Sequence, residues 1–186
     1  MTISYDEYKY WVIDCLQNGT VEDLEWTSQH FPDFPFGLDC FGHSWINDAI
    51  FIGSIESVKW MISKGVNLYF VDDEGYSPLH CCIDSMRPDK YEIMQLLIDG
   101  GADVDIGTEW ETHKWMGTNG WTPLHMAVRR NDLEAVKILL KNNADTTLRT
   151  PIDDYSTAEE DAFRCGNHEA AELIRAYNET RTKPFV

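Results

Sequence analysis

The sequence has 186 residues and is strongly acidic, because 32 aspartates and glutamates outnumber 15 lysines and arginines and give a formal net charge of −17. A hydrophobic fraction of 43% with 25% charged residues is typical of a folded globular chain and excludes extended disorder. Such a charge disfavours nucleic acid and anionic membranes as partners and favours encounter with basic proteins, although acidity can also serve solubility alone.

The cysteines and the N-terminal residues indicate the cellular compartment of the protein. The cysteine count is odd, there is no C-x-x-C pair, and most of the cysteines lie in apolar runs, which predicts reduced, buried thiols. The first residues lack a signal-peptide pattern, and no stretch of about 18 apolar residues occurs. We therefore expect a cytoplasmic chain. The cysteines are Cys15, Cys40, Cys81, Cys82 and Cys165.

The register of an internal repeat at residues 75–80 and 120–125 extends back through the first 62 residues. It predicts two pairs of helices, residues 8–16 with 19–26 and residues 44–50 with 53–62. Between the pairs, residues 31–37 are rich in proline and aromatic residues and predict a turn.

An internal repeat follows. Residues 75–80 read Gly-Tyr-Ser-Pro-Leu-His, and residues 120–125 read Gly-Trp-Thr-Pro-Leu-His. The Ser or Thr predicts a helix N-cap, the proline suits the first helical position, and the leucine begins the buried face. A second, apolar helix follows each motif and is predicted to end at a left-handed residue, Gly101 or Asn143.

The last predicted pair of helices covers residues 157–162 and 166–174. Its first helix carries Glu159 and Glu160 where the inner repeats place apolar groups. This substitution is typical of a terminal repeat that faces water.

The whole pattern resembles the ankyrin repeat. The resemblance implies an all-α fold, an ankyrin-repeat solenoid of about five helix-turn-helix units with β-turn fingers, in a single domain over residues 1–186. It also implies that His80 and His125 are structural and bridge neighbouring turns. In the second unit Trp45 replaces the proline and Asn47 the histidine. The predicted units are about 5–38, 39–71, 72–107, 117–149 and 150–178, with a finger insert at 108–116.

Two insertions interrupt the period. Gly42 and Gly75 are 33 residues apart, whereas Gly75 and Gly120 are 45 apart. About three of the twelve extra residues lengthen a turn near residues 86–90, and about nine form the finger insert. Insertions in repeat proteins map to loops, often on the binding face.

No catalytic motif is present, so we expect no enzyme activity, no cofactor and no metal. The acidic runs at residues 72–74 and 109–111 lack the spacing of a calcium loop and are interpreted as exposed finger charge. His43 and His113 lack ligand spacing. Cys81 and Cys82 occupy positions for small packed residues.

The family resemblance places partner contacts at the finger tips and on the exposed face of the first helices. Aromatic residues are frequent there, as in interface hot spots. For the inserted Trp110 and Trp115, the alternative is packing back onto the stack. The predicted partner-binding residues are Tyr69, Phe70, Asp73, Glu74, Tyr76, Asp84, Trp110, Trp115, Trp121, Arg129 and Arg130, and the same projection includes Phe41, His43, Phe51, Ile52 and Asn119.

Charge is uneven along the chain. Residues 39–116 carry fourteen acids and five bases, whereas residues 117–149 carry three acids and five bases. The sequence therefore predicts a non-catalytic, monomeric protein-binding module, an inhibitor or immunity protein that occludes a basic protein partner. The alternatives are a scaffold or adaptor, including a kinase-inhibitor-like regulator in signalling, and a host-directed effector.

Overall fold

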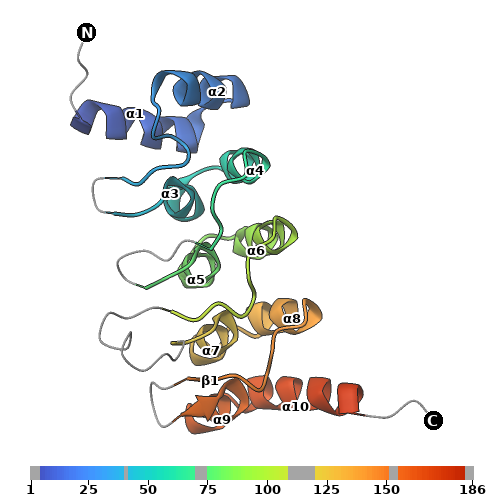
Figure 1. The fold of residues 1–186 in the computed structure, drawn as a ribbon. Coiled ribbons are helices and arrows are strands. Elements are labelled where there is room, and N and C mark those ends of the chain that lie inside the picture. Colours follow the sequence, from blue (N-terminus) through green and yellow to red (C-terminus); the bar gives the residue numbers. More distant parts are fainter. Residues whose placement is uncertain (1–4, 40–41, 70–74, 109–119, 151–154, 183–186) are drawn as a thin grey trace. The chain divides into compact units, whose positions relative to one another are not determined.

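The computed structural model describes residues 5–39, 42–69, 75–108, 120–150 and 155–182. The chain divides into two compact units, Met1–Ala102 and Asp103–Val186. Within each unit, pairs of helices follow one another and are joined by turns (Figure 1). The predicted all-α fold is confirmed, while the assignment of one domain to the whole chain stays a prediction.

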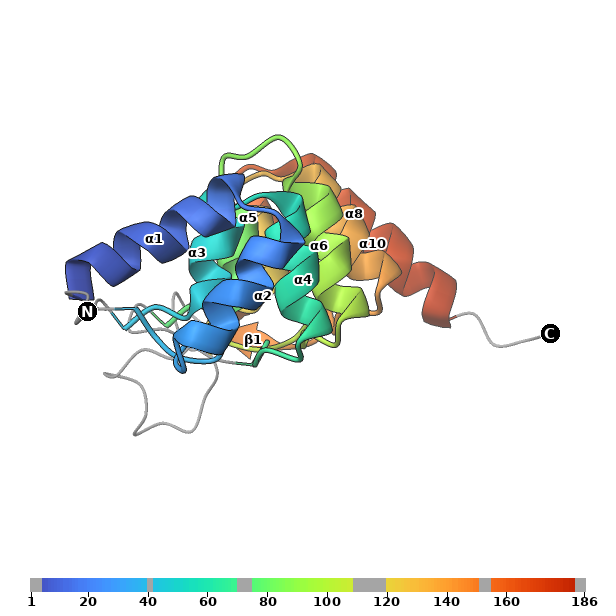
Figure 2. The ribbon, with the colours of Figure 1, turned by 90° about the horizontal axis from the view of Figure 1, so that it is seen from above.

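The first unit contains three helix pairs arranged in two layers. Helices α1, α3 and α5 pack in succession in one layer, and α2, α4 and α6 pack in the other (Figures 1 and 2). Their apolar sides meet in a core that includes the fully buried Leu16, Ile50, Met61 and Leu97. The helices are α1 (Tyr5–Asn18), α2 (Val21–His30), α3 (Trp45–Ile52), α4 (Ile55–Ser63), α5 (Pro78–Asp84) and α6 (Lys90–Asp99).

Several of these helices have a serine or threonine N-cap, as the sequence predicts. The hydroxyl of Ser77 accepts the backbone N–H of His80, and the imidazole of His80 in turn accepts the backbone N–H of Ser77. Pro78 occupies the first turn of α5. After α6, Gly101 has a φ of +99°, the left-handed conformation expected at the end of this helix. The predicted roles of Ser77, Pro78 and Gly101 are therefore confirmed.

The aromatic turn between α2 and α3 contributes to the core. Phe34 is 1% exposed, and its ring stacks on Trp60 at 5.6 Å and meets the edge of Trp45 at 6.0 Å. Phe36, two residues later, is exposed. The turn predicted at residues 31–37 is thus anchored on the second helix pair, because Trp45 lies on α3 and Trp60 on α4.

The lengthened turn before α6 contains Arg87, whose contacts with the end of α3 were not predicted from the sequence. Nη1 of Arg87 donates to the backbone oxygens of Ala49, Ile50 and Gly53, at 3.1, 2.9 and 2.8 Å. Its Nε and Nη2 donate to the two carboxylate oxygens of Asp89, both at 2.7 Å. Arg87 therefore supplies a charged donor to the carbonyls at the end of α3, of which the Ala49 oxygen also accepts the backbone N–H of Gly53.

The second unit contains two helix pairs and a short β-ribbon that the sequence analysis did not predict. The strands pair antiparallel, with Arg149 opposite Thr157 and Thr150 opposite Ser156. Leu124, Leu139 and Ile174 are among the buried residues of its core. The elements are α7 (Pro123–Arg129), α8 (Leu133–Lys141), β1 (Arg149–Thr150), β2 (Ser156–Thr157), α9 (Ala158–Arg164) and α10 (His168–Thr182).

His125 links the two helix pairs of this unit. Its Nδ1 lies 2.8 Å from the hydroxyl of Thr122, and its Nε2 lies 3.2 Å from the backbone oxygen of Ser156. The hydroxyl of Ser156 donates to Asp161 at 2.6 Å. This chain of buried contacts confirms the bridging role expected of His125, and burial lowers the pKa of its imidazole.

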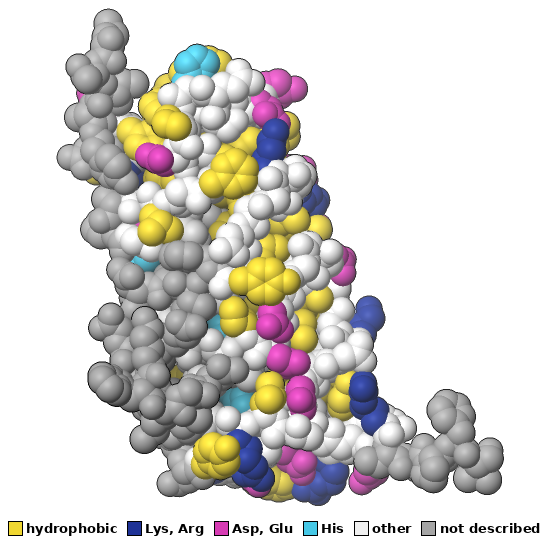
Figure 3. Space-filling model, viewed as in Figure 1, with side chains coloured by type: hydrophobic (Ala, Val, Ile, Leu, Met, Phe, Trp, Pro, Cys, Tyr) yellow, Lys and Arg dark blue, Asp and Glu magenta, His cyan; other side chains and the backbone are white. Residues whose placement is uncertain are grey.

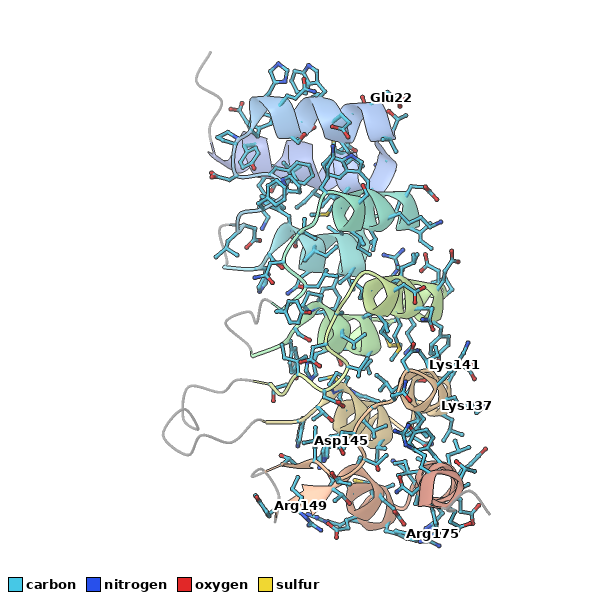
Figure 4. The ribbon with its side chains drawn as sticks, turned by 45° about the vertical axis from the view of Figure 1, so that its right-hand side comes forward. Glu22, Lys137, Lys141, Asp145, Arg149 and Arg175 are labelled. Atoms are coloured by element: carbon cyan, nitrogen blue, oxygen red, sulfur yellow. The ribbon has the colours of Figure 1, made fainter. Side chains whose placement is uncertain are left out.

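The last helix pair, α9 and α10, carries ion pairs at its surface. Arg149 binds Glu160 at 2.9 Å, and Arg175 binds Glu159 at 3.1 Å; both arginines are labelled in Figure 4. Asn143 has a φ of +65°, as predicted for the end of α8.

Most of the described cysteines are buried, as the sequence predicts. Cys15, Cys81 and Cys82 are buried and reduced. The expectation of burial is wrong for Cys165, which is exposed because it lies at the C-cap of α9. Cys40 lies outside the described residues. Among the described helices, none is long and apolar enough to cross a bilayer.

Candidate protein-binding surface

Four of the projected partner-contact residues come together in the first unit. His43, Phe51, Tyr76 and Asp84 line a cavity of about 80 Å³ between α3 and α5. Asn47, Asp48 and Cys81 complete its lining, and we call this site the α3–α5 pocket.

The helical periodicity of α3 and α5 builds this pocket. Asp48 and Phe51 are three residues apart on α3, and Cys81 and Asp84 are three apart on α5, so each pair shares one helix face. Tyr76 precedes α5, and its ring stacks on His80 with a centroid distance of 6.0 Å. The pocket therefore combines two carboxylates with two aromatic rings.

Asp48 is a residue that the sequence analysis missed. Its Oδ2 atom is buried, and no donor among the described residues lies within hydrogen-bonding distance. Burial raises the pKa of its carboxyl group to about 6, the negative charge of Asp39 adds to the increase, and Lys9 and His43 oppose it. Its position on α3 corresponds to that of Cys81 on α5, and this repeat register is the signal that could have identified it.

Asp48 also belongs to a group with metal-ligating side chains. One ligand atom each of Asp39, His43 and Asp48 lies within 4.8 Å of the others. However, Nζ of Lys9 donates to one oxygen of Asp39 at 3.0 Å, and the backbone N–H of His43 donates to the other at 2.9 Å. A divalent cation would have to compete with Lys9, so this group is better explained as the hydrogen-bonded base of a finger.

The second unit brings together two other predicted residues. The guanidinium of Arg129, at the end of α7, lies over the ring of Trp121 at 4.3 Å from its centroid. The backbone of Trp121 exchanges hydrogen bonds with Thr108, whose N–H donates to the Trp121 oxygen at 2.9 Å. Gly120 packs so closely on Thr108 that a Cβ would collide with the Thr108 backbone. The ends of the finger insert are thus held together. Arg130, the C-cap residue of α7, is exposed.

The remaining predicted positions are exposed or lie outside the described residues. Tyr69 is 60% exposed, and Phe51 and Ile52 are also exposed. The predictions for Phe41, Phe70, Asp73, Glu74, Trp110, Trp115 and Asn119, the acidic runs at 72–74 and 109–111, and most of the insert at 108–116 lie outside the described residues.

The first helix pair presents an aromatic surface that was not predicted. Trp11 and Trp26 are each about half exposed, with ring centroids 5.6 Å apart, and His30 stacks on Trp26 at 4.0 Å. Tyr10 is 75% exposed. Figure 3 shows hydrophobic and acidic side chains side by side on the surface of the first unit.

The acidic charge is concentrated in the same unit. Residues 1–102 carry seventeen acids and five bases, whereas residues 103–186 carry fifteen acids and ten bases. The first unit therefore has a net charge of −12 and the second of −5. The first unit therefore combines the larger share of the negative charge with exposed aromatic rings.

Comparison with known proteins agrees with this architecture. The family model for three copies of the ankyrin repeat matches residues 13–108, just over half of the chain, and the model for a single ankyrin repeat matches residues 119–151.

Relatives carry the similarity within longer chains. The human transient receptor potential cation channel subfamily A member 1 is 31% identical over 107 residues, which are 58% of this chain and 9% of the relative. A probable E3 ubiquitin-protein ligase of Oryza sativa subsp. japonica is 30% identical over 57% of this chain and 18% of its own length. A putative ankyrin repeat protein of fowlpox virus is 25% identical over 88% of this chain and 34% of its own. This chain thus spans at most about a third of the length of these relatives. The repeat pattern, the helix pairs and the family models together show that the chain belongs to the ankyrin-repeat family, whose members are protein-interaction modules.

Proposed function

We propose that this protein is a non-catalytic inhibitor, of the immunity-protein kind, that occludes a basic surface of its protein partner. The observation that carries the proposal is the net charge of −12 in the first unit, where carboxylates and aromatic rings meet in the α3–α5 pocket. Long-range charge would accelerate association, and the desolvated aromatic contacts would slow dissociation.

The proposed partner is a protein rather than nucleic acid or a membrane. Phosphate groups would be repelled by the net charge of −17. The reduced thiols of Cys15, Cys81 and Cys82 support a reducing compartment such as the cytosol, where the free protein would act as a monomer.

The test begins with affinity purification from cells that express the protein natively, followed by identification of the captured chain. Association of that partner is then measured as salt is raised from about 50 to about 500 mM. We expect the association rate to fall about tenfold or more, because the Debye length becomes shorter than the spacing of surface charges. An association rate that is independent of salt, or an acidic partner, would contradict the proposal.

A second function is favoured by the relatives. One of them is named a probable E3 ubiquitin-protein ligase, and the similarity covers only 18% of it. In a scaffold or adaptor, including a kinase-inhibitor-like regulator, this stack would instead recruit a protein to a further component. A purification that recovers two chains, of which one is held only through the other, would support the adaptor.

A further inference from the structure

The α3–α5 pocket offers a negative charge and apolar walls in one small cavity. Asp48 and Asp84 come from two neighbouring helices, and Phe51 and Tyr76 supply ring surface. The volume of about 80 Å³ is several times the roughly 15 Å³ that one water molecule requires. Carboxylates beside aromatic rings suit a cationic side chain, because the carboxylates pair with the cation while the rings attract it through their faces.

The Oδ2 atom of Asp48 has no cationic donor among the described residues. Nζ of Lys9, on α1, is bonded to Asp39, whereas Oδ2 of Asp48 is buried with no donor among the described residues. His43 is the other titratable group of this cluster. A buried carboxylate oxygen without a donor is unfavourable, so a donor that enters the pocket would gain interaction energy there.

We propose that the α3–α5 pocket receives an arginine side chain of a protein partner. The planar guanidinium carries five N–H donors, so it can bond Asp48 and Asp84 together and stack on an aromatic ring. Its methylene groups would lie along Phe51, which is 46% exposed. This inference rests on the proposed function, since it names the side chain by which a basic partner would be recognised.

Small probes test the pocket without the partner. The ¹⁵N-labelled full-length protein is titrated with acetyl-arginine amide and, separately, with acetyl-citrulline amide, a neutral molecule of nearly the same shape. We expect saturable shifts of the amide signals at residues 47–51 and 81–84 with the arginine probe alone.

Two variants remove one carboxylate each. Asp48→Asn should weaken binding of acetyl-arginine amide about tenfold or more, because a desolvated ion pair is lost. The matched control is Glu22→Gln, which removes a carboxylate from the exposed first turn of α2 (Figure 4) and should leave the affinity unchanged. Melting temperatures verify that both variants fold, and Asp84→Asn is the second pocket variant if Asp48→Asn does not fold.

The outcomes separate this inference from the proposed function. Equal weakening by Asp48→Asn and Glu22→Gln would mean diffuse attraction to an acidic surface and would overturn the pocket while leaving the proposed function standing. Equal shifts with citrulline, or shifts that do not saturate, would also overturn it. Failure of the proposed function appears in a different measurement, as salt-independent association of the purified partner.

Discussion

Arg87 provides the most direct test of how the lengthened turn stabilises the first unit. Its side chain is 14% exposed and holds three backbone oxygens at the end of α3 as well as the carboxylate of Asp89. In Arg87→Ala these oxygens lose a charged donor in a place that water enters poorly. A hydrogen bond from a charged group contributes about 1.5–3 kcal/mol, and the three oxygens share one nitrogen. We therefore expect the free energy of unfolding to fall by about 2–4 kcal/mol.

The measurement is urea unfolding of the full-length protein, followed by circular dichroism at a helical wavelength. Arg87→Lys should be intermediate, because an ammonium keeps the charge but lacks the planar fork that bonds Asp89 at two atoms. The control is Lys59→Ala, which removes exposed ion pairs with Glu56 and Glu92 and should change stability far less, because exposed ion pairs contribute little to stability. If Arg87→Ala were no more destabilising than Lys59→Ala, the capping role of Arg87 would be refuted.

Four further predictions concern the second unit, the metal-ligand group and the binding residues. Leu124→Ala should destabilise the protein by about 2–5 kcal/mol in urea, because Leu124 is buried, and an unchanged transition would show that it does not pack as a core residue. Because burial lowers the pKa of His125, the unfolded chain binds the proton first, so stability should fall as pH drops below about 6.5; His125→Gln should flatten that dependence. EDTA should leave the melting temperature and partner binding unchanged. A loss of binding on EDTA that added cation restores would show that Asp39, His43 and Asp48 bind a metal ion. Tyr76→Ala or Trp121→Ala should weaken partner binding by roughly 2 kcal/mol with little change in melting temperature, and neutral variants would place the interface elsewhere.

Local signals in the sequence were sufficient to predict the helix pairs. Caps and helix ends depend on residues within a few positions of each other, so Ser77, Pro78 and Gly101 could be read directly from the repeated motif. The role of His125 was also predicted, but through the family resemblance, because its contact with Ser156 joins residues 31 positions apart.

Tertiary structure decided what no local pattern contains. Arg87 reaches backbone oxygens of α3 more than thirty residues earlier, and the β-ribbon pairs two strands of only two residues each. The sequence by itself determined the repeat, the helix pairs and the acidic character, since these depend on period and composition. Only the packing of α3 against α5 decided that the Oδ2 atom of Asp48 is buried and that Asp48 shares a pocket with Tyr76 and Asp84, because burial and proximity depend on neighbours that are distant in the chain.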